Sequence, residues 1–65
     1  MALSNEEKRI VIQQLDVMDE VVRRVVISTL DALADWLMSK LPEIFAKIRD
    51  ALMDVWSWIR KTFSV

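Results

Sequence analysis

Apolar side chains recur at helical spacing through the first forty residues. Between Val11 and Val25 they are separated by alternating steps of four and three, the near-heptad stripe of an amphipathic helix. Ser4 and Glu7 precede this stripe in the spacing of a capping box, which marks a helix N-terminus. The pattern predicts one long helix over residues 5–39.

A weaker stretch near residue 28 leaves an alternative open. The run 25–27 is β-branched throughout, which lowers its helix propensity. Ser28, followed three residues later by Asp31, suits a second N-cap. The first arm is therefore either one continuous helix, which we favour, or two helices hinged near residues 27–29.

The single proline, Pro42, marks the main break in the chain. It disfavours the α conformation at Leu41 and fits the first turn of a new helix. Beyond it, apolar positions gather on one side of a helical wheel, so the pattern predicts a second helix over residues 42–63.

These elements predict an all-α fold: a helix–proline–helix hairpin forming one small domain over residues 1–65 and assembling into a multi-helix bundle. The chain has no glycine and no alternating strand pattern, which argues for few turns and against a sheet. We expect the two arms to pack through a helix–helix interface of Leu15, Met18, Val22, Leu33, Trp36, Leu37, Phe45, Ile48, Leu52, Trp56 and Ile59.

The amino-acid composition limits which catalytic and metal sites the chain can form. The chain has no cysteine and no histidine, which argues against zinc, haem and iron–sulfur sites and excludes hydrolase triads. We predict no catalytic, cofactor or metal site, no small-molecule substrate and no enzymatic activity. Nine basic and ten acidic residues give a net charge of −1, which does not suit a nucleic-acid binder. Neither a signal peptide nor an uncharged run of membrane-spanning length is visible, so localisation stays open.

The two predicted helical arms differ in length, which indicates that the protein functions by associating with another chain. A long first helix would leave the apolar residues of its N-terminal third without a partner in the second arm. We therefore expect a self-associating or protein-interaction module, either a homo-oligomer or a partner of another amphipathic helix.

The C-terminal segment suggests a second class of function. Trp58, Arg60, Lys61 and Phe63 interleave aromatic rings with cations, as in peptides that bind a membrane surface or a protein partner. The alternative function is thus an amphipathic, membrane-active peptide of the toxin or bacteriocin kind.

Two short segments of the first arm resemble known helical peptides. One resembles the BH3 pattern, which implies binding in a Bcl-2-type groove, although Asp31 stands where such segments often carry a basic residue. The other is similar to delta-haemolysin-type lytic peptides over about eleven residues, but it contains Asp35 and no neighbouring cation. We assign the chain to neither family. The BH3-like positions are Val26, Leu30, Leu33, Ala34, Asp35 and Leu37, and the lytic-peptide positions are Ile27, Ser28, Thr29, Leu30, Leu33, Trp36 and Leu37.

Overall fold

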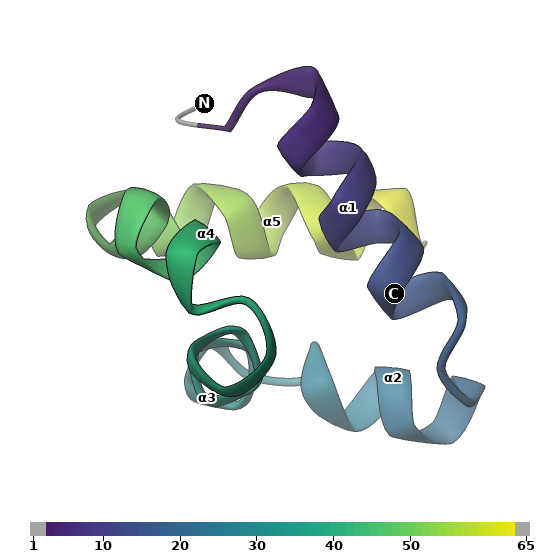
Figure 1. The fold of residues 1–65 in the computed structure, drawn as a ribbon. Coiled ribbons are helices and arrows are strands. Elements are labelled where there is room, and N and C mark those ends of the chain that lie inside the picture. Colours follow the sequence, from purple (N-terminus) through teal and green to yellow (C-terminus); the bar gives the residue numbers. More distant parts are fainter. Residues whose placement is uncertain (1–2, 64–65) are drawn as a thin grey trace.

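Side-chain caps decide where the first three helices begin. A computed structural model describes residues 3–63. Ser4 and Glu7 form the predicted capping box, with each side chain bonded to the other residue's backbone N–H. Asp19 and Thr29 accept the backbone N–H groups of Val21 and Ala32 in the same way. The elements are α1 (Asn5–Asp16), α2 (Glu20–Val26), α3 (Leu30–Lys40), α4 (Pro42–Ile48), the 3₁₀ turn η1 (Arg49–Ala51) and α5 (Leu52–Thr62) (Figure 1).

The prediction of one long helix over residues 5–39 is wrong. The chain leaves the helix at residues 17–19 and again at 27–29. A straight helix of that length would measure about 50 Å, whereas the longest dimension of the molecule is 27 Å. Because each break carries a residue that caps the next helix, folding the arm back costs few unsatisfied backbone groups. The hinge near residue 28 is confirmed, with Thr29 as the cap in place of Ser28.

The helix–proline–helix junction is confirmed. Leu41 leaves the helical region, with φ −137° and ψ 61°, and Pro42 is the first residue of α4. Proline suits this position because its missing N–H would have had no intrahelical partner. The all-α prediction also holds, since residues 3–63 contain no strand.

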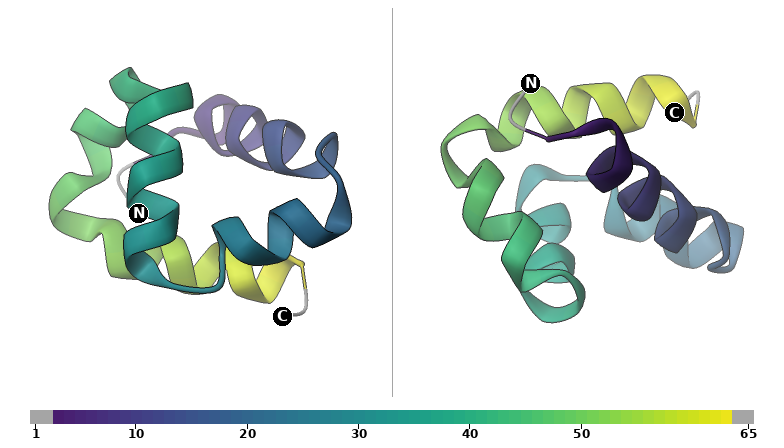
Figure 2. Two further views of the ribbon diagram at one scale, coloured as in Figure 1. Left: turned by 90° about the horizontal axis from the view of Figure 1, so that it is seen from below. Right: turned by 45° about the horizontal axis from the view of Figure 1, so that its top comes forward.

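The second arm is bent, contrary to the single helix predicted over residues 42–63. The 3₁₀ turn η1 separates α4 from α5, and the two helices run in clearly different directions (Figures 1 and 2). The bend allows Ile44 and Ile48 of α4 to enter the same core as Val55 and Ile59 of α5.

One apolar core joins α1, α3, α4 and α5. Its members are the residues with little or no solvent exposure: Leu3, Val11, Leu15, Ile27, Leu33, Leu37, Ile44, Ile48, Val55 and Ile59. They come from α1, α3, α4 and α5, together with the segments that precede α1 and α3. Helix α2 contributes no fully buried residue and lies along one edge of the molecule (Figure 1).

Candidate interaction surface

Most residues of the predicted helix–helix interface lie in this intramolecular core. Five of them, Leu15, Leu33, Leu37, Ile48 and Ile59, are fully buried. Another five are partly buried against them: Met18, Trp36, Phe45, Leu52 and Trp56. These side chains therefore hold one chain together and leave little apolar surface for a second one.

Val22 is the exception, and its assignment to the packed stripe is wrong. It is 51% exposed. The stripe predicted for the first arm assumed that residues 17–19 are helical. Because α1 ends at Asp16 and α2 begins at Glu20, the register changes, and α2 turns Val22 towards solvent.

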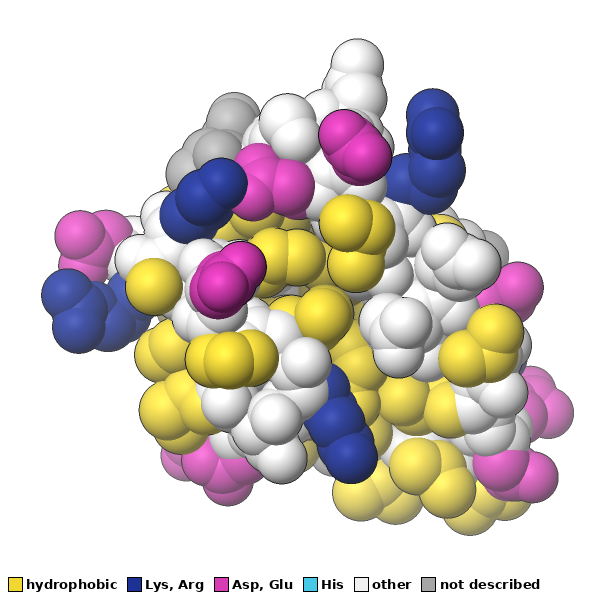
Figure 3. All heavy atoms as spheres, in the orientation of Figure 1, with side chains coloured by type: hydrophobic (Ala, Val, Ile, Leu, Met, Phe, Trp, Pro, Cys, Tyr) yellow, Lys and Arg dark blue, Asp and Glu magenta, His cyan; other side chains and the backbone are white. Residues whose placement is uncertain are grey.

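An exposed apolar surface results at the corner between α1 and α2. We call Val17, Val21, Val22 and Val25 the valine face; they are 74%, 68%, 51% and 62% exposed. Val21 and Val25 are one helical turn apart, and Val22 lies beside them. Figure 3 shows hydrophobic side chains gathered over the edge where α2 lies, with acidic side chains at their border. Single exposed apolar residues are ordinary, but a contiguous group of them marks interaction surfaces.

Helix α2 is held in place from its opposite side by polar contacts. The Arg23 guanidinium donates to the Leu15 carbonyl at 3.2 Å and lies 4.7 Å from the centre of the Phe63 ring. At the end of α2, the Trp56 indole N–H donates to the Ile27 carbonyl at 2.9 Å. These contacts fix the orientation in which α2 presents the valine face.

The C-terminal aromatic residues are engaged within the chain. Besides the Arg23–Phe63 pair, Arg60 stacks on Trp56 with its guanidinium 4.9 Å from the ring centre. Trp58 is half-buried against the core, and the Lys8 ammonium lies 5.9 Å from its ring centre. Of the four residues predicted to contact a membrane or a partner, only Lys61 is exposed.

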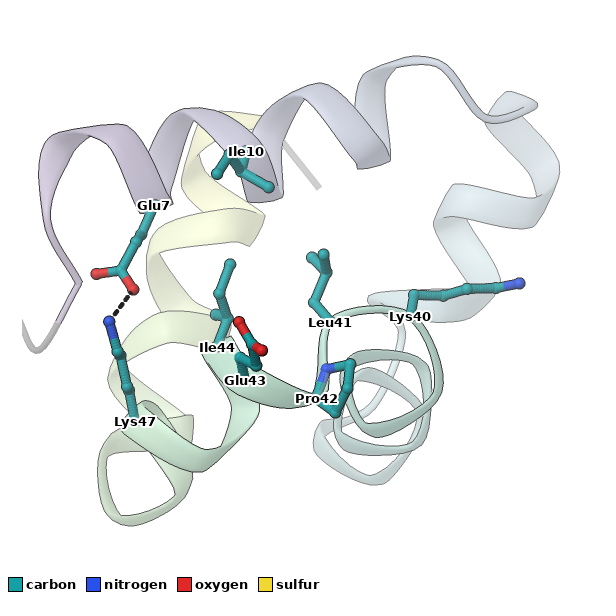
Figure 4. A pocket seen from close by; sticks show the side chains of 8 residues that line it. All are labelled: Glu7, Ile10, Lys40, Leu41, Pro42, Glu43, Ile44 and Lys47. Atoms are coloured by element: carbon teal, nitrogen blue, oxygen red, sulfur yellow. Dashed lines mark hydrogen bonds and ion pairs between the residues drawn. The ribbon is translucent and has the colours of Figure 1, made fainter.

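A groove of about 450 Å³ lies between α1 and the α3–α4 junction. In Figure 4, Ile10 from α1 and Leu41 and Ile44 from the junction point into it, and an ion pair between Glu7 and Lys47 closes one end. Its lining residues are Glu7, Ile10, Lys40, Leu41, Pro42, Glu43, Ile44 and Lys47. Two carboxylates and two ammonium groups cancel in charge, so the groove does not select for a charged ligand.

Within the groove, the ion pair between Glu7 and Lys47 shifts the pKa values of both side chains. The hydrogen bond from Lys47, with further help from the Ser4 backbone N–H, lowers the pKa of Glu7 below its ordinary value of 4.5. The same contact raises the pKa of Lys47 above 10.5. Both shifts favour the charged forms. The pair therefore acts as a link between α1 and α4 and not as an acid–base couple near neutral pH.

Metal-binding groups and membrane-spanning helices can be looked for in the part of the chain that the structure describes. Residues 3–63 contain no group of three or more carboxylates that could hold a metal ion. In the same range, none of the helices combines the length and apolar character needed to cross a bilayer. The BH3-like and lytic-peptide-like segments share Leu33 and Leu37, which have no exposed surface, so either segment would have to leave the fold to act.

Comparison with known proteins adds no relative. No protein family, curated protein or solved structure matches the chain. Function must therefore be argued from the surface of this molecule.

Proposed function

We propose that this protein is a non-enzymatic helical interaction module that self-associates through the valine face. The observation that carries the proposal is the exposure of four valines at one corner of a molecule whose other branched apolar side chains are mostly buried. Burying apolar surface is worth about 25 cal/mol per Å², and a second copy of the same face is an available partner. The net charge of −1 gives two copies little reason to repel each other.

The area of the face sets the expected strength. A standard interface buries about 800 Å² per partner, and four partly exposed valine side chains supply less than that. The association should therefore belong to the weak, transient class. We expect a dissociation constant between micromolar and millimolar, because small interfaces leave little surplus over the entropy lost on association.

Charge at the border favours a protein partner over an anionic membrane. Asp16, Asp19 and Glu20 are exposed next to the valines together with one exposed cation, Arg24, whereas Arg23 is held against Phe63. Helices that lie on anionic lipid carry mainly lysine and arginine on the polar side. Three carboxylates against one exposed arginine beside the apolar face would oppose such contact.

Sedimentation equilibrium from micromolar to millimolar concentration tests the proposal. The weight-average mass should rise from 7.6 kDa towards twice that value as concentration increases. The double variant Val21→Gln/Val25→Gln should remain monomeric, because it removes apolar area while it keeps the charge of α2 and does not lower its helix propensity.

A matched control comes from two exposed methionines outside α2. Met38 and Met53 are 48% and 64% exposed, so Met38→Gln/Met53→Gln removes apolar surface elsewhere and should associate like the wild type. A wild-type protein that stays at the monomer mass up to millimolar concentration would overturn the proposal. If that monomer also bound anionic vesicles at low salt, the membrane alternative would replace it.

A further inference from the structure

We infer that the partner copy docks antiparallel, with its α2 against α2 about a twofold axis, so that the Glu20–Arg24 ion pair is exchanged between subunits. This inference rests on the proposed function and specifies its geometry. In a twofold interface the same surface is used by both subunits, so each contact must occur twice. The arrangement of charges on α2 then decides which relative direction of the two helices is favoured.

The charges on α2 favour the antiparallel direction. Glu20 and Arg24 are one helical turn apart and form an exposed ion pair at 3.2 Å on the flank of the helix. In a parallel twofold pair, the flank that carries Glu20 and Arg24 would face the opposite flank of the other α2, where Val22 and Val26 lie and no counter-charge is available. In the antiparallel direction each Glu20 faces the Arg24 of the other copy, which gives two cross-subunit ion pairs and no like-charge contact.

The valines on the same helix fit this direction. Val21 and Val25 are also one turn apart, so an antiparallel partner places Val21 of each copy opposite Val25 of the other. An axis midway between these positions creates two equivalent valine contacts. The charged pair then lies along the rim, where both partners remain hydrated and their exchange costs little desolvation.

The position of α2 in the fold leaves room for a second helix. No other helix lies outside it along the edge that it forms (Figure 1), and in the view from below it faces the reader (Figure 2, left). None of its residues is fully buried. The contacts of Arg23 and Trp56 come from the inner side and do not compete with a partner.

The absence of cysteine makes the geometry directly measurable. Val21→Cys and Val25→Cys chains, mixed in equal amounts and oxidised, should give mainly the mixed disulfide, because a disulfide needs Cα atoms roughly 4.4–6.8 Å apart. Random pairing would make the mixed species half of all disulfide dimers. Met53→Cys, on α5 and outside the face, is the matched control and should crosslink only at the rate of random collision.

Three outcomes decide the inference. A mixed disulfide well above half of the product supports antiparallel docking. Homodisulfides in excess would show parallel docking, and a statistical mixture would show no preferred geometry; either result overturns the inference. Sedimentation of the same chains under reducing conditions separates these failures from a failure of the proposed function, because dimers without the predicted crosslink would remain visible by mass.

Reversing the charges at Glu20 and Arg24 supplies a second measurement. Glu20→Arg should weaken the dimer about tenfold, since two rim pairs of the usual strength are lost. The swapped variant Glu20→Arg/Arg24→Glu should regain the wild-type dissociation constant, because it restores both cross-subunit pairs. If the swapped variant stayed as weak as the single one, these side chains would not face each other across the interface.

Discussion

Individual side chains do more than fill the core of this protein. Trp56 closes the C-terminal end of α2 by donating its indole N–H to the Ile27 carbonyl at 2.9 Å. Ile27 itself is fully buried. A buried carbonyl without a partner costs more than the bond contributes when formed, so this contact ties α5 to the segment between α2 and α3.

At this scale we expect Trp56→Phe to destabilise the fold by about 1–3 kcal/mol, because the Ile27 carbonyl loses its donor while most of the ring remains. Trp58→Phe is the control. It removes a similar group, but no hydrogen bond from the Trp58 indole occurs within residues 3–63. Urea unfolding followed by circular dichroism gives both values. Equal losses in the two variants would show that the hydrogen bond contributes nothing.

At the scale of elements, the caps distinguish this fold from the long helix expected. Polar residues at positions 19 and 29 compete with helix continuation by bonding to the backbone of the next turn. Helical periodicity alone does not register this competition, because Asp19 and Thr29 are also tolerated on the polar side of a continuous helix. The hinge near residue 28 was visible in the sequence as weak propensity, whereas the break at residues 17–19 was not anticipated.

The cap of α3 offers a test at this scale. Thr29→Ala should lower the free energy of unfolding by about 1 kcal/mol, since the Ala32 N–H loses its acceptor. Thr29→Ser keeps a hydroxyl at the same position and should stay within a few tenths of the wild type. Thermal or urea unfolding monitored at 222 nm compares the three proteins. An alanine variant as stable as the serine variant would mean that Ser28 takes over the cap.

At the scale of the whole molecule, one ion pair joins parts of the chain that are forty residues apart. Glu7 of α1 and Lys47 of α4 meet at the end of the groove. The pKa of Glu7 is lowered chiefly by the hydrogen bond from Lys47. A carboxylate whose pKa is lower in the folded state stabilises that state above its unfolded pKa, and this contribution disappears as the pH falls through the folded value.

Glu7→Gln should therefore be less stable than the wild type at pH 7, and the difference should shrink as the pH falls below about 4.5. Glutamine can still bond to the Ser4 N–H, so the capping box is kept. The control is Glu6→Gln, which removes a carboxylate of the same turn that forms no ion pair within residues 3–63. Urea midpoints across pH 3–7 measure the effect. A pH-independent difference would show that the ion pair does not contribute.

The sequence by itself determined the helical class, the break at Pro42 and the cap at Ser4, because each follows from local chemistry: side-chain periodicity, a missing N–H and a hydroxyl three residues from a glutamate. It also showed most residues of the packed interface, since Leu33, Leu37, Ile48 and Ile59 are apolar at helical spacing whatever they pack against.

Only the tertiary structure decided which apolar residues stay outside. Val22 and Leu15 belong to the same sequence stripe, yet one is exposed and the other has no solvent contact. Periodicity places residues on faces only within one helix, and a break of three residues resets the register between two. Folding α1 back also buried Val11 and Leu15, in the N-terminal third that was expected to seek a partner. The exposed apolar surface lies instead around α2, and it is this surface that we propose for self-association.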